Sequence, residues 1–274
     1  MTTANTQASF ADRVRCSVQQ GIAHVVLDRP RKLNALDGAM LEALVQAGLH
    51  LIDRTDVRVV VLSGAGRAFS AGLDLSQFAQ MQCGHGADAV VIGDRFGAAR
   101  ALGQKAVHVW SMVPVPVVAA VHGVAFGGGL QIALGADIRI VAPDTQLSVM
   151  EIQWGLVPDM AGTQLLPKAI GDGMAKELTF TGRKFDGTAA AEMKLATRLA
   201  DDPLEAALEL AHEIAPHSRT ALCQAKRLLD MAGRVPLADA FDAEQDAIAQ
   251  LIGSDEQVAT IRHRLERVCL MCDA

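Results

Sequence analysis

The spacing of apolar residues along the chain predicts strands and helices in alternation. Short apolar runs at residues 14–18 and 22–27, separated by a polar turn, predict a strand hairpin that ends before Pro30. Residues 38–52 then carry apolar side chains at helical spacing, which predicts an amphipathic helix, and the run at 57–63 predicts a buried strand.

A second round of strand and helix follows. The strand predicted at 117–123 leads into three consecutive glycines, a helical pattern at 130–136 and an apolar strand at 137–142. Strands that alternate with helices favour right-handed crossovers and a largely parallel sheet that is covered on both faces. The pattern therefore predicts an α/β fold.

The pattern changes near residue 202. From there on, four helical patterns follow one another without a strand pattern. The first residues are polar and carry no periodic apolar positions. We therefore predict a flexible tail at 1–13, an α/β core at 14–200 and a helical subdomain at 201–274.

The composition argues against several classes of protein. The 274-residue chain is half apolar, so it can bury a large core, and its net charge of -6 disfavours a nucleic-acid partner. No stretch reaches the roughly 20 apolar residues of a membrane span, and the N-terminus lacks an apolar secretory segment. Five scattered cysteines, including the pair Cys269 and Cys272, indicate free thiols rather than disulfides or a metal site. We expect a cytoplasmic protein without a metal ion.

Two glycine-bearing turns, at 61–75 and 119–133, share one design. Each leaves a strand, passes through small residues and enters a helix, and neither has the spacing of a nucleotide-binding loop. Glycine lets a backbone N–H approach a ligand closely, and two such turns can direct two N–H groups at one oxygen, as in an oxyanion hole. The alternative is that Gly127–Gly129 only allow close helix packing.

Four motifs surround these turns in order: DRPRKLNAL at 28–36, GAGRAFSAGLDL at 64–75, PVVAAVHGVAFGGGLQIALGADIRIVAP at 116–143 and GLVPDMAGTQLLPKAIG at 155–171. Together they resemble the motifs of the crotonase superfamily, the enoyl-CoA hydratase/isomerase family. The resemblance implies a crotonase-like (ββα)n spiral core whose helical C-terminal subdomain helps to form a homotrimer, usually stacked as a homohexamer. It also implies an acyl-CoA substrate, so that coenzyme A is part of the substrate and no separate cofactor is needed.

The resemblance gives roles to residues of the first two turns. The N–H groups of Leu73 and Gly128 would form the oxyanion hole that holds the thioester oxygen while an enolate develops. Ala71 and Asp74 would bind the substrate beside the first donor, and Asp74 would also cap or order the loop.

Gln131 stands where the hydratases of this family carry one of two catalytic glutamates. Glutamine cannot take or give a proton at neutral pH, so we expect Gln131 to bind as a hydrogen-bonding wall that orients substrate or water. Glu151 matches the second glutamate, and Asp159 follows eight residues later. Dienoyl-CoA isomerases of the family are similar at both positions, and moving a double bond needs only a base, an acid and a stabilised dienolate. We expect isomerisation with Glu151 as the preferred base.

The sequence leaves alternatives open. Glu151 could hydrate an enoyl-CoA with a weakened partner at Gln131, or the chain could be a non-catalytic acyl-CoA-binding scaffold. As structural alternatives, Glu151 could be a surface residue at a strand end, and Asp159 could satisfy a turn after Pro158. A nucleophilic dehalogenase role for Asp159 is disfavoured, because only 4% of the residues are aromatic.

Residues 81–110 shape the acyl pocket in the resembled family, and here they predict a glycine-bearing loop that runs into a helix. Met81, Phe96 and Trp110 are candidates for lining the pocket, with plain core packing as the alternative. Lys194 stands where the family pattern has a glycine, and the sequence gives it no function. Basic side chains that could meet the phosphates of coenzyme A are Arg29, Lys32 and Lys226.

Overall fold

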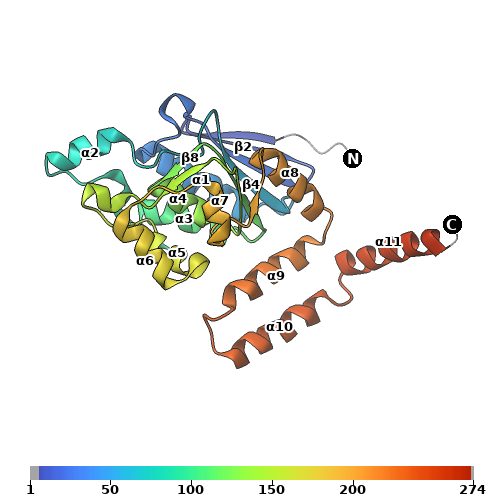
Figure 1. Cartoon of the computed structure of the whole chain (residues 1–274). Coiled ribbons are helices and arrows are strands. Elements are labelled where there is room, and N and C mark those ends of the chain that lie inside the picture. Colours follow the sequence, from blue (N-terminus) through green and yellow to red (C-terminus); the bar gives the residue numbers. More distant parts are fainter. Residues whose placement is uncertain (1–5, 273–274) are drawn as a thin grey trace.

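The computed structural model describes residues 6–272, with side chains for residues 7–266, and its core is a spiral of strands and helices (Figure 1). Seven strands form the main sheet. They are β1 (Thr6–Phe10), β2 (Val14–Gln19), β3 (Ile22–Leu27), β4 (Val59–Gly64), β7 (Val117–Val121), β9 (Ile138–Val141) and β11 (Arg198–Leu199). They lie in the order β1-β2-β3-β4-β7-β9-β11. The first three strands pair antiparallel and those from β3 onward pair parallel, which confirms the predicted hairpin and parallel sheet.

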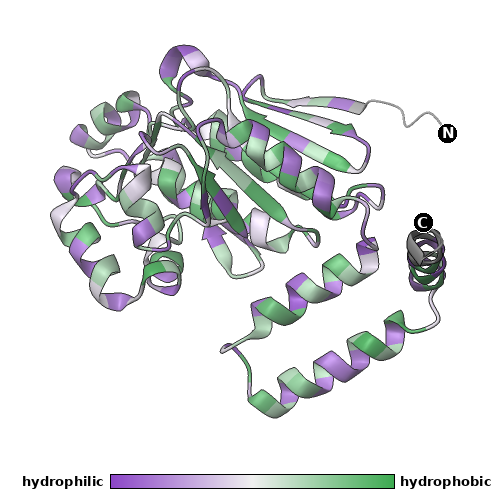
Figure 2. Cartoon of the chain, turned by 45° about the vertical axis from the view of Figure 1, so that its right-hand side comes forward, coloured by the Kyte–Doolittle hydropathy of each residue, from purple (hydrophilic) through white to green (hydrophobic). Residues whose placement is uncertain are grey.

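Helices cover both faces of the main sheet. On one face, α1 (Gly38–Ile52) and α3 (Leu102–Met112) pack together over the larger apolar cluster of the core. On the other face, α8 (Pro203–Ile214) contacts β4, β7 and β9 over a second apolar cluster. Figure 2 shows the resulting hydrophobic strands between helices of mixed character. Burial of these apolar faces is the main source of stability for such a layered fold.

Residues 6–10 differ from the flexible tail that we expected at 1–13. They form β1, which pairs antiparallel with β2 so that Phe10 lies opposite Val14. The ring of Phe10 packs against the core, with its centroid 5.8 Å from that of His50. β1 lies at the edge of the sheet, where polar side chains can face water, so its sequence lacks the apolar pattern of the buried strands.

A second layer of short pairings joins the loops that leave the main sheet. β8 (Val124–Phe126) pairs parallel with β10 (Gln146–Ser148), and isolated bridges join Leu36 to Leu73 and Ser70 to Ala125. The sequence pattern did not predict β8, because the strand has only three residues and lies beside the glycines. This layer holds the loop that follows β4 and the loop that follows β7 side by side.

The remaining elements of the core connect these layers. The stretch 81–110 contains a strand hairpin that the sequence pattern did not predict, followed by the predicted helix. The connecting elements are η1 (Pro30–Lys32), α2 (Leu75–Gln82), η2 (Asp88–Val90), β5 (Ile92–Phe96), β6 (Ala99–Ala101), α4 (Gly128–Leu134), η3 (Glu151–Trp154), α5 (Gly162–Ile170), α6 (Asp172–Thr181) and α7 (Gly187–Glu192).

Lys194 follows α7 and stands where the pattern of the resembled family has a glycine. Its backbone has φ of 64°, and its N–H donates to the Ala191 carbonyl over 2.9 Å, as in a left-handed helix end. Glycine adopts this conformation more readily than any other residue. The lysine therefore occupies a backbone position that favours glycine.

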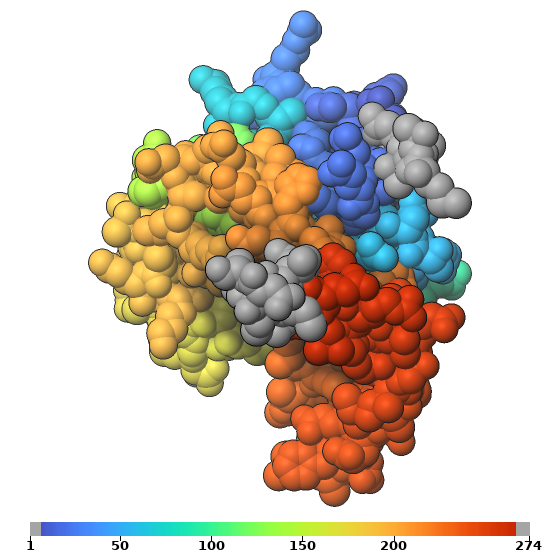
Figure 3. All heavy atoms as spheres, turned by 90° about the vertical axis from the view of Figure 1, so that its right-hand side faces the viewer, coloured from blue at the N-terminus to red at the C-terminus, as the bar shows by residue number. Residues whose placement is uncertain are grey.

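Three helices extend away from the core at the C-terminal end (Figures 1 and 3). They are α9 (Arg219–Met231), α10 (Leu237–Leu251) and α11 (Asp255–Cys272). Lys226 joins α9 to the core, because its ammonium group pairs with Asp137 and donates to the carbonyls of Trp110 and Val115. Lys226 was expected as a contact for phosphates, but these buried bonds already occupy its three donors. Large apolar side chains of the three helices remain exposed, among them Leu229 and Leu237.

No helix within residues 6–272 combines the length and the apolar character that crossing a membrane requires. Within the side chains that the structure describes, Cys16, Cys83 and Cys223 are free thiols. The pair formed by Cys269 and Cys272 has side chains outside the described ones.

Candidate active site

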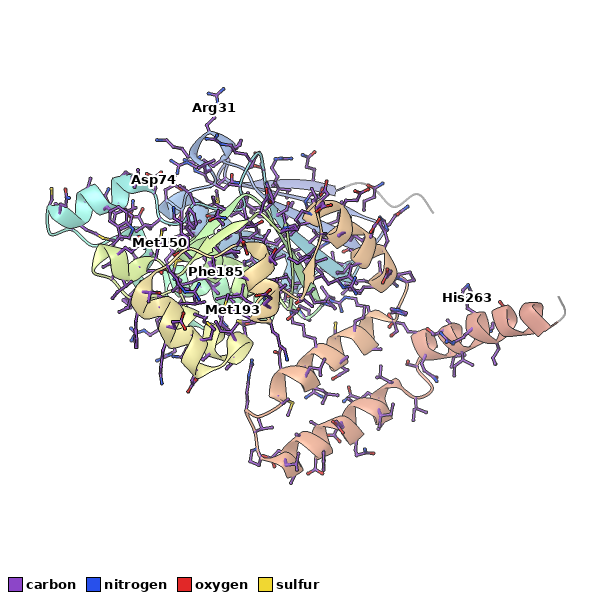
Figure 4. The ribbon with its side chains drawn as sticks, viewed as in Figure 1. Arg31, Asp74, Met150, Phe185, Met193 and His263 are labelled. Atoms are coloured by element: carbon purple, nitrogen blue, oxygen red, sulfur yellow. The ribbon has the colours of Figure 1, made fainter. Side chains whose placement is uncertain are left out.

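A cavity of about 370 Å³ opens where the loops of the second layer meet. The backbone of Ala71–Leu73 and of Gly127–Gly128 forms part of its wall, and both Glu151 and Asp159 line it. In Figure 4, Asp74 and Met150 lie on this flank of the core, near α2, whereas His263 lies on the distant α11. The rest of the lining is apolar and includes Leu75, Phe78, Met81, Met150, Trp154 and Met160.

The bridge between Leu36 and Leu73 orients the first backbone donor. Leu36 donates its N–H to the Gly72 carbonyl over 2.8 Å, and Asp74 donates its N–H to the Leu36 carbonyl over 2.9 Å. The N–H of Leu73 therefore points to the side of the strand opposite Leu36. Among residues 6–272, none accepts a hydrogen bond from it.

The second donor lies at the start of α4. Gly127 has φ of 50° and donates its N–H to the Ser148 carbonyl over 2.9 Å, which ties the turn to β10. Gly128 then begins the helix, where N–H groups have no partner inside the helix. The described residues offer no acceptor to the N–H of Gly128.

The glycines let the two donor loops touch. A side-chain carbon on Gly72 would come within 2.4 Å of the Phe126 carbonyl oxygen and 3.7 Å of the Gly128 nitrogen. A side-chain carbon on Gly129 would likewise come within 2.5 Å of the Ser70 carbonyl oxygen. Gly72 and Gly129 therefore allow close packing, and this packing brings the loop of Leu73 beside the N–H of Gly128.

Glu151 lies at the start of η3, directly after the second layer. Its Oε1 accepts a hydrogen bond of 2.6 Å from Gln131, while its Oε2 is buried without a partner among the described residues. Burial raises the pKa of the Glu151 carboxyl, and the nearby Asp159 raises it further. Since Glu151 is half-buried and lines the cavity, it is not the surface residue that we considered as an alternative.

Asp159 lines the same cavity after the turn at Pro158. Its side chain keeps contact with solvent, yet the surrounding walls bury it enough to raise the pKa of its carboxyl. Two carboxyl groups with raised pKa values thus share one cavity with the two N–H donors. Groups of this kind are more frequent at catalytic sites than elsewhere. In the described part of the chain, no three His, Cys, Asp or Glu side chains gather as metal ligands would.

Gln131 is not a wall of the cavity, as we expected, but lies behind Glu151. Its side chain is 2% exposed, and its Oε1 accepts the N–H of Gly162 over 2.8 Å. Its Nε2 donates to Glu151, so both ends of the amide group are used within the protein. Gln131 therefore contacts a catalytic candidate rather than the space that a substrate would occupy.

Asp74 also lies behind the lining, whereas Ala71 belongs to it. The Asp74 carboxylate caps α2 by accepting the N–H of Ser76 over 3.0 Å, and it pairs with Arg29. The substrate-binding role expected of Asp74 has no support here, and its role in ordering the loop does. Arg29 was expected as a contact for phosphates but is held by Asp74 and Asp37, while Lys32 is exposed.

Of the three pocket candidates from 81–110, only Met81 lines the cavity. Trp110 is fully buried in the core, and Phe96 packs against the core from β5. The sequence pattern missed an aromatic pair, since Phe78 and Trp154 stack with ring centroids 4.2 Å apart and both line the cavity. They come from segments far apart in sequence, and only the fold brings them together.

The sequence matches the family described as Enoyl-CoA hydratase/isomerase over residues 17–268. Among curated relatives, the mouse mitochondrial enoyl-CoA hydratase domain-containing protein 2 is 34% identical over 246 residues, which cover 87% of this chain and 80% of the relative. The mouse mitochondrial Delta(3,5)-Delta(2,4)-dienoyl-CoA isomerase is 36% identical over 211 residues, which cover 75% of this chain and 64% of the relative.

Solved structures share the fold. Enoyl-CoA hydratase from Bacillus anthracis superposes with a TM-score of 0.83 at 30% identity, covering 93% of this chain and 96% of that one. A Thermobifida fusca protein in complex with acetoacetyl-CoA superposes with a TM-score of 0.75 at 31% identity, covering 88% of this chain and 95% of that one. These likenesses confirm the spiral core and the helical C-terminal region that the sequence predicted.

Proposed function

Because the chain belongs to the enoyl-CoA hydratase/isomerase family, the crotonase superfamily, we propose that it shifts a double bond in an enoyl-CoA or dienoyl-CoA thioester. The single observation that carries this proposal is the shared cavity, in which two N–H groups without an acceptor among residues 6–272 meet two carboxyl groups of raised pKa. Isomerisation needs these groups and no positioned water.

In the proposed reaction, the Glu151 carboxylate takes a proton from the carbon next to the thioester carbonyl. The electron pair moves toward the carbonyl oxygen, where the N–H groups of Leu73 and Gly128 hold the negative charge. A carboxylic acid then returns a proton at the other end of the conjugated system, and we assign this step to Asp159. The carbonyl is thereby restored with the double bond in its new position.

Hydration of an enoyl-CoA is the second candidate, because Glu151 and Asp159 line one cavity and could divide the work of activating water. The buried amide of Gln131 argues against it, because it cannot transfer a proton where the family's hydratases carry the other catalytic glutamate beside the one matched by Glu151. A scaffold that binds acyl-CoA without chemistry is disfavoured by Glu151, because its buried Oε2 has no partner among the described residues and a buried polar atom without a hydrogen bond destabilises the fold.

An acyl-CoA ligand fits the remaining lining of the cavity. Apart from Glu151 and Asp159, the side chains that line it are apolar, so an apolar acyl group would lose little by leaving water. A fold relative was solved in complex with acetoacetyl-CoA, which supports a thioester of coenzyme A as the ligand class. The phosphates would then lie toward solvent, where Lys32 is exposed.

We also assign assembly to the three C-terminal helices, as expected for a homotrimer or homohexamer. Leu229 is 77% exposed, Leu237 68% and Ile252 67%, which is unusual for side chains of this size on the surface of a monomer. Sedimentation velocity measures the assembly directly, and a monomer at micromolar concentration would contradict it. A cytoplasmic location remains the proposal made from the sequence.

Deuterium exchange tests the reaction. The protein is incubated in deuterated water with a panel of 2-enoyl, 3-enoyl and dienoyl thioesters, and deuterium at the α and γ carbons is measured by mass spectrometry. We expect deuterium at both ends of the shifted double bond. Addition of water without migration would instead support hydration, and binding without any exchange would support the scaffold.

A further inference from the structure

A buried chain of hydrogen bonds runs from the backbone of α5 to the carboxyl group of Glu151. The Gly162 N–H donates to Gln131 Oε1 over 2.8 Å, and Gln131 Nε2 donates to Glu151 Oε1 over 2.6 Å. A side-chain carbon on Gly162 would come within 2.6 Å of the Gln131 oxygen, which shows how tightly the amide is enclosed. The amide group therefore has little room to turn.

The direction of this chain is fixed by its first member. A backbone N–H can only donate, so it selects the oxygen of the Gln131 amide and turns the amide nitrogen toward Glu151. The amide nitrogen also can only donate, and Glu151 Oε1 must therefore accept. The bond from Gln131 thereby fixes how the carboxyl group of Glu151 is turned, and Oε2 is left without a partner among the described residues.

We infer that Gln131 is a positioning residue that holds the carboxyl group of Glu151 in the orientation in which it takes the substrate proton. The inference rests on the proposed function and deepens it. Gln131 takes no proton itself, but its bond to Oε1 fixes the orientation of the base. Glutamine at this position, where the family's hydratases carry a glutamate, then supports the proton transfer and does not mean that the protein has lost its activity.

Two effects should follow when the donor of Gln131 is removed. Burial raises the pKa of Glu151, and the hydrogen bond from Gln131 lowers it. Without that bond, the pKa of Glu151 should therefore be higher. The carboxyl group would also be free to turn, and a misplaced base loses roughly 10²-fold in rate. Neither effect requires a change in how the substrate binds.

The test compares Gln131→Met, Gln131→Glu and the matched control Gln77→Met. Gln131→Met removes both bonds, whereas Gln131→Glu keeps an acceptor for Gly162 and replaces the donor by a second ionisable carboxyl group beside Glu151. Gln77 is also a buried glutamine, 4% exposed, and accepts the Asp88 N–H over 2.8 Å without touching Glu151. If Gln131→Met fails to fold, the titration of Glu151 can still be measured in Gln131→Glu.

The direct readout is the titration of Glu151, followed by NMR in protein with ¹³C-labelled glutamate. The Glu151 resonance is the one that disappears in Glu151→Gln. We expect a higher pKa of Glu151 in both Gln131 variants and no change in Gln77→Met. Exchange at the α carbon should show a kcat roughly 10²-fold lower in Gln131→Met, with KM within about threefold and the acidic limb of the pH profile moved to higher pH.

The outcomes separate this inference from the proposed function. If Glu151 titrates as in the parent protein in both Gln131 variants, Gln131 does not hold the carboxyl group and the inference is overturned, whatever the activity. If the titration moves but the parent exchanges no deuterium with any thioester, the proposed function fails. In that case Gln131 still orients Glu151, but Glu151 takes no substrate proton.

Discussion

Asp74 and Glu151 are carboxylates on two neighbouring loops of one site, and their surroundings have opposite effects. Partial burial tends to raise the pKa of Asp74, but bonds from the Ser76 N–H and from Arg29 outweigh it and hold the pKa at about 2. Glu151 receives a side-chain bond only from Gln131 among the described residues, and burial raises its pKa. The Asp74 carboxylate accepts several hydrogen bonds, whereas Oε2 of Glu151 accepts none from the described residues.

This difference separates an acid that orders a loop from an acid that can transfer protons. A carboxylate with a pKa near 2 is a very weak base at neutral pH and stabilises its loop through its bonds. A carboxyl group with a raised pKa binds and releases protons closer to neutral pH, which general acid–base catalysis requires. The protein places both kinds within one pair of loops.

The largest effect should come from Glu151→Gln, which keeps the size of the side chain and removes the base. We expect exchange at the α carbon to fall by about 10² to 10⁴, the range for loss of a general base. Glu177→Gln is the matched control, because Glu177 is exposed on α6 and pairs only with Arg183 among the described residues. Exchange that survives in Glu151→Gln at the parent rate would assign the base elsewhere.

Stability should respond to pH in the same variant. The folded pKa of Glu151 lies above its ordinary value of 4.5, so the folded state binds more protons than the unfolded state in that window. The free energy of unfolding of the parent should therefore decrease as pH rises from 4.5 through the raised pKa. Urea unfolding should show a smaller decrease in Glu151→Gln, in which the raised pKa of Asp159 still contributes.

The next largest effect concerns Asp159, which shares the cavity with Glu151 but remains open to solvent. In Asp159→Asn we expect double-bond migration to fall by about 10², because the proton for the far carbon has lost its donor. Exchange at the α carbon should stay within about threefold, since Glu151 alone takes that proton. If both rates fall equally, the two carboxyl groups do not have separate roles.

Asp74→Ala should act on stability instead. It removes a helix cap and an ion pair, and we expect unfolding in urea to require about 1–2 kcal/mol less at neutral pH. Asp186→Ala is the control for a cap alone, because Asp186 accepts the Ala189 N–H over 2.8 Å on α7. The stability from the lowered pKa of Asp74 is present above pH 3.8 and is lost as pH falls toward about 2, so the Asp74→Ala difference should shrink there.

Much of the fold and of the candidate site could be predicted from the sequence. The apolar periodicity predicted the parallel sheet, and the glycine turns predicted a pair of N–H donors, because these signals act within a few positions. The spiral core and the grouping of Leu73, Gly128, Glu151 and Asp159 came from the resemblance of the ordered motifs to the crotonase superfamily. The structure brings all four residues to one cavity, while their roles stay predictions.

The sequence did not predict which side chains point into the cavity. Gln131 was predicted on the cavity wall and lies behind it, and Trp110 was a pocket candidate but is fully buried in the core. A helix of known span still has two faces, and tertiary packing decides which face meets the cavity. The stack of Phe78 on Trp154 depends on contacts between distant segments, which periodicity does not report.

The smallest predicted effect concerns Lys194, whose contribution to stability depends on its backbone conformation rather than on the chemistry of its side chain. Lys194 has an exposed side chain and φ of 64°, so Lys194→Gly should remove strain and increase the free energy of unfolding by about 0.5–1 kcal/mol. Lys176→Gly, at an exposed position inside α6, should instead lower it by about 1 kcal/mol. Equal destabilisation in both variants would mean that the lysine side chain outweighs its backbone. Exchange at the α carbon should be unchanged in both variants, because neither side chain lines the cavity with Glu151.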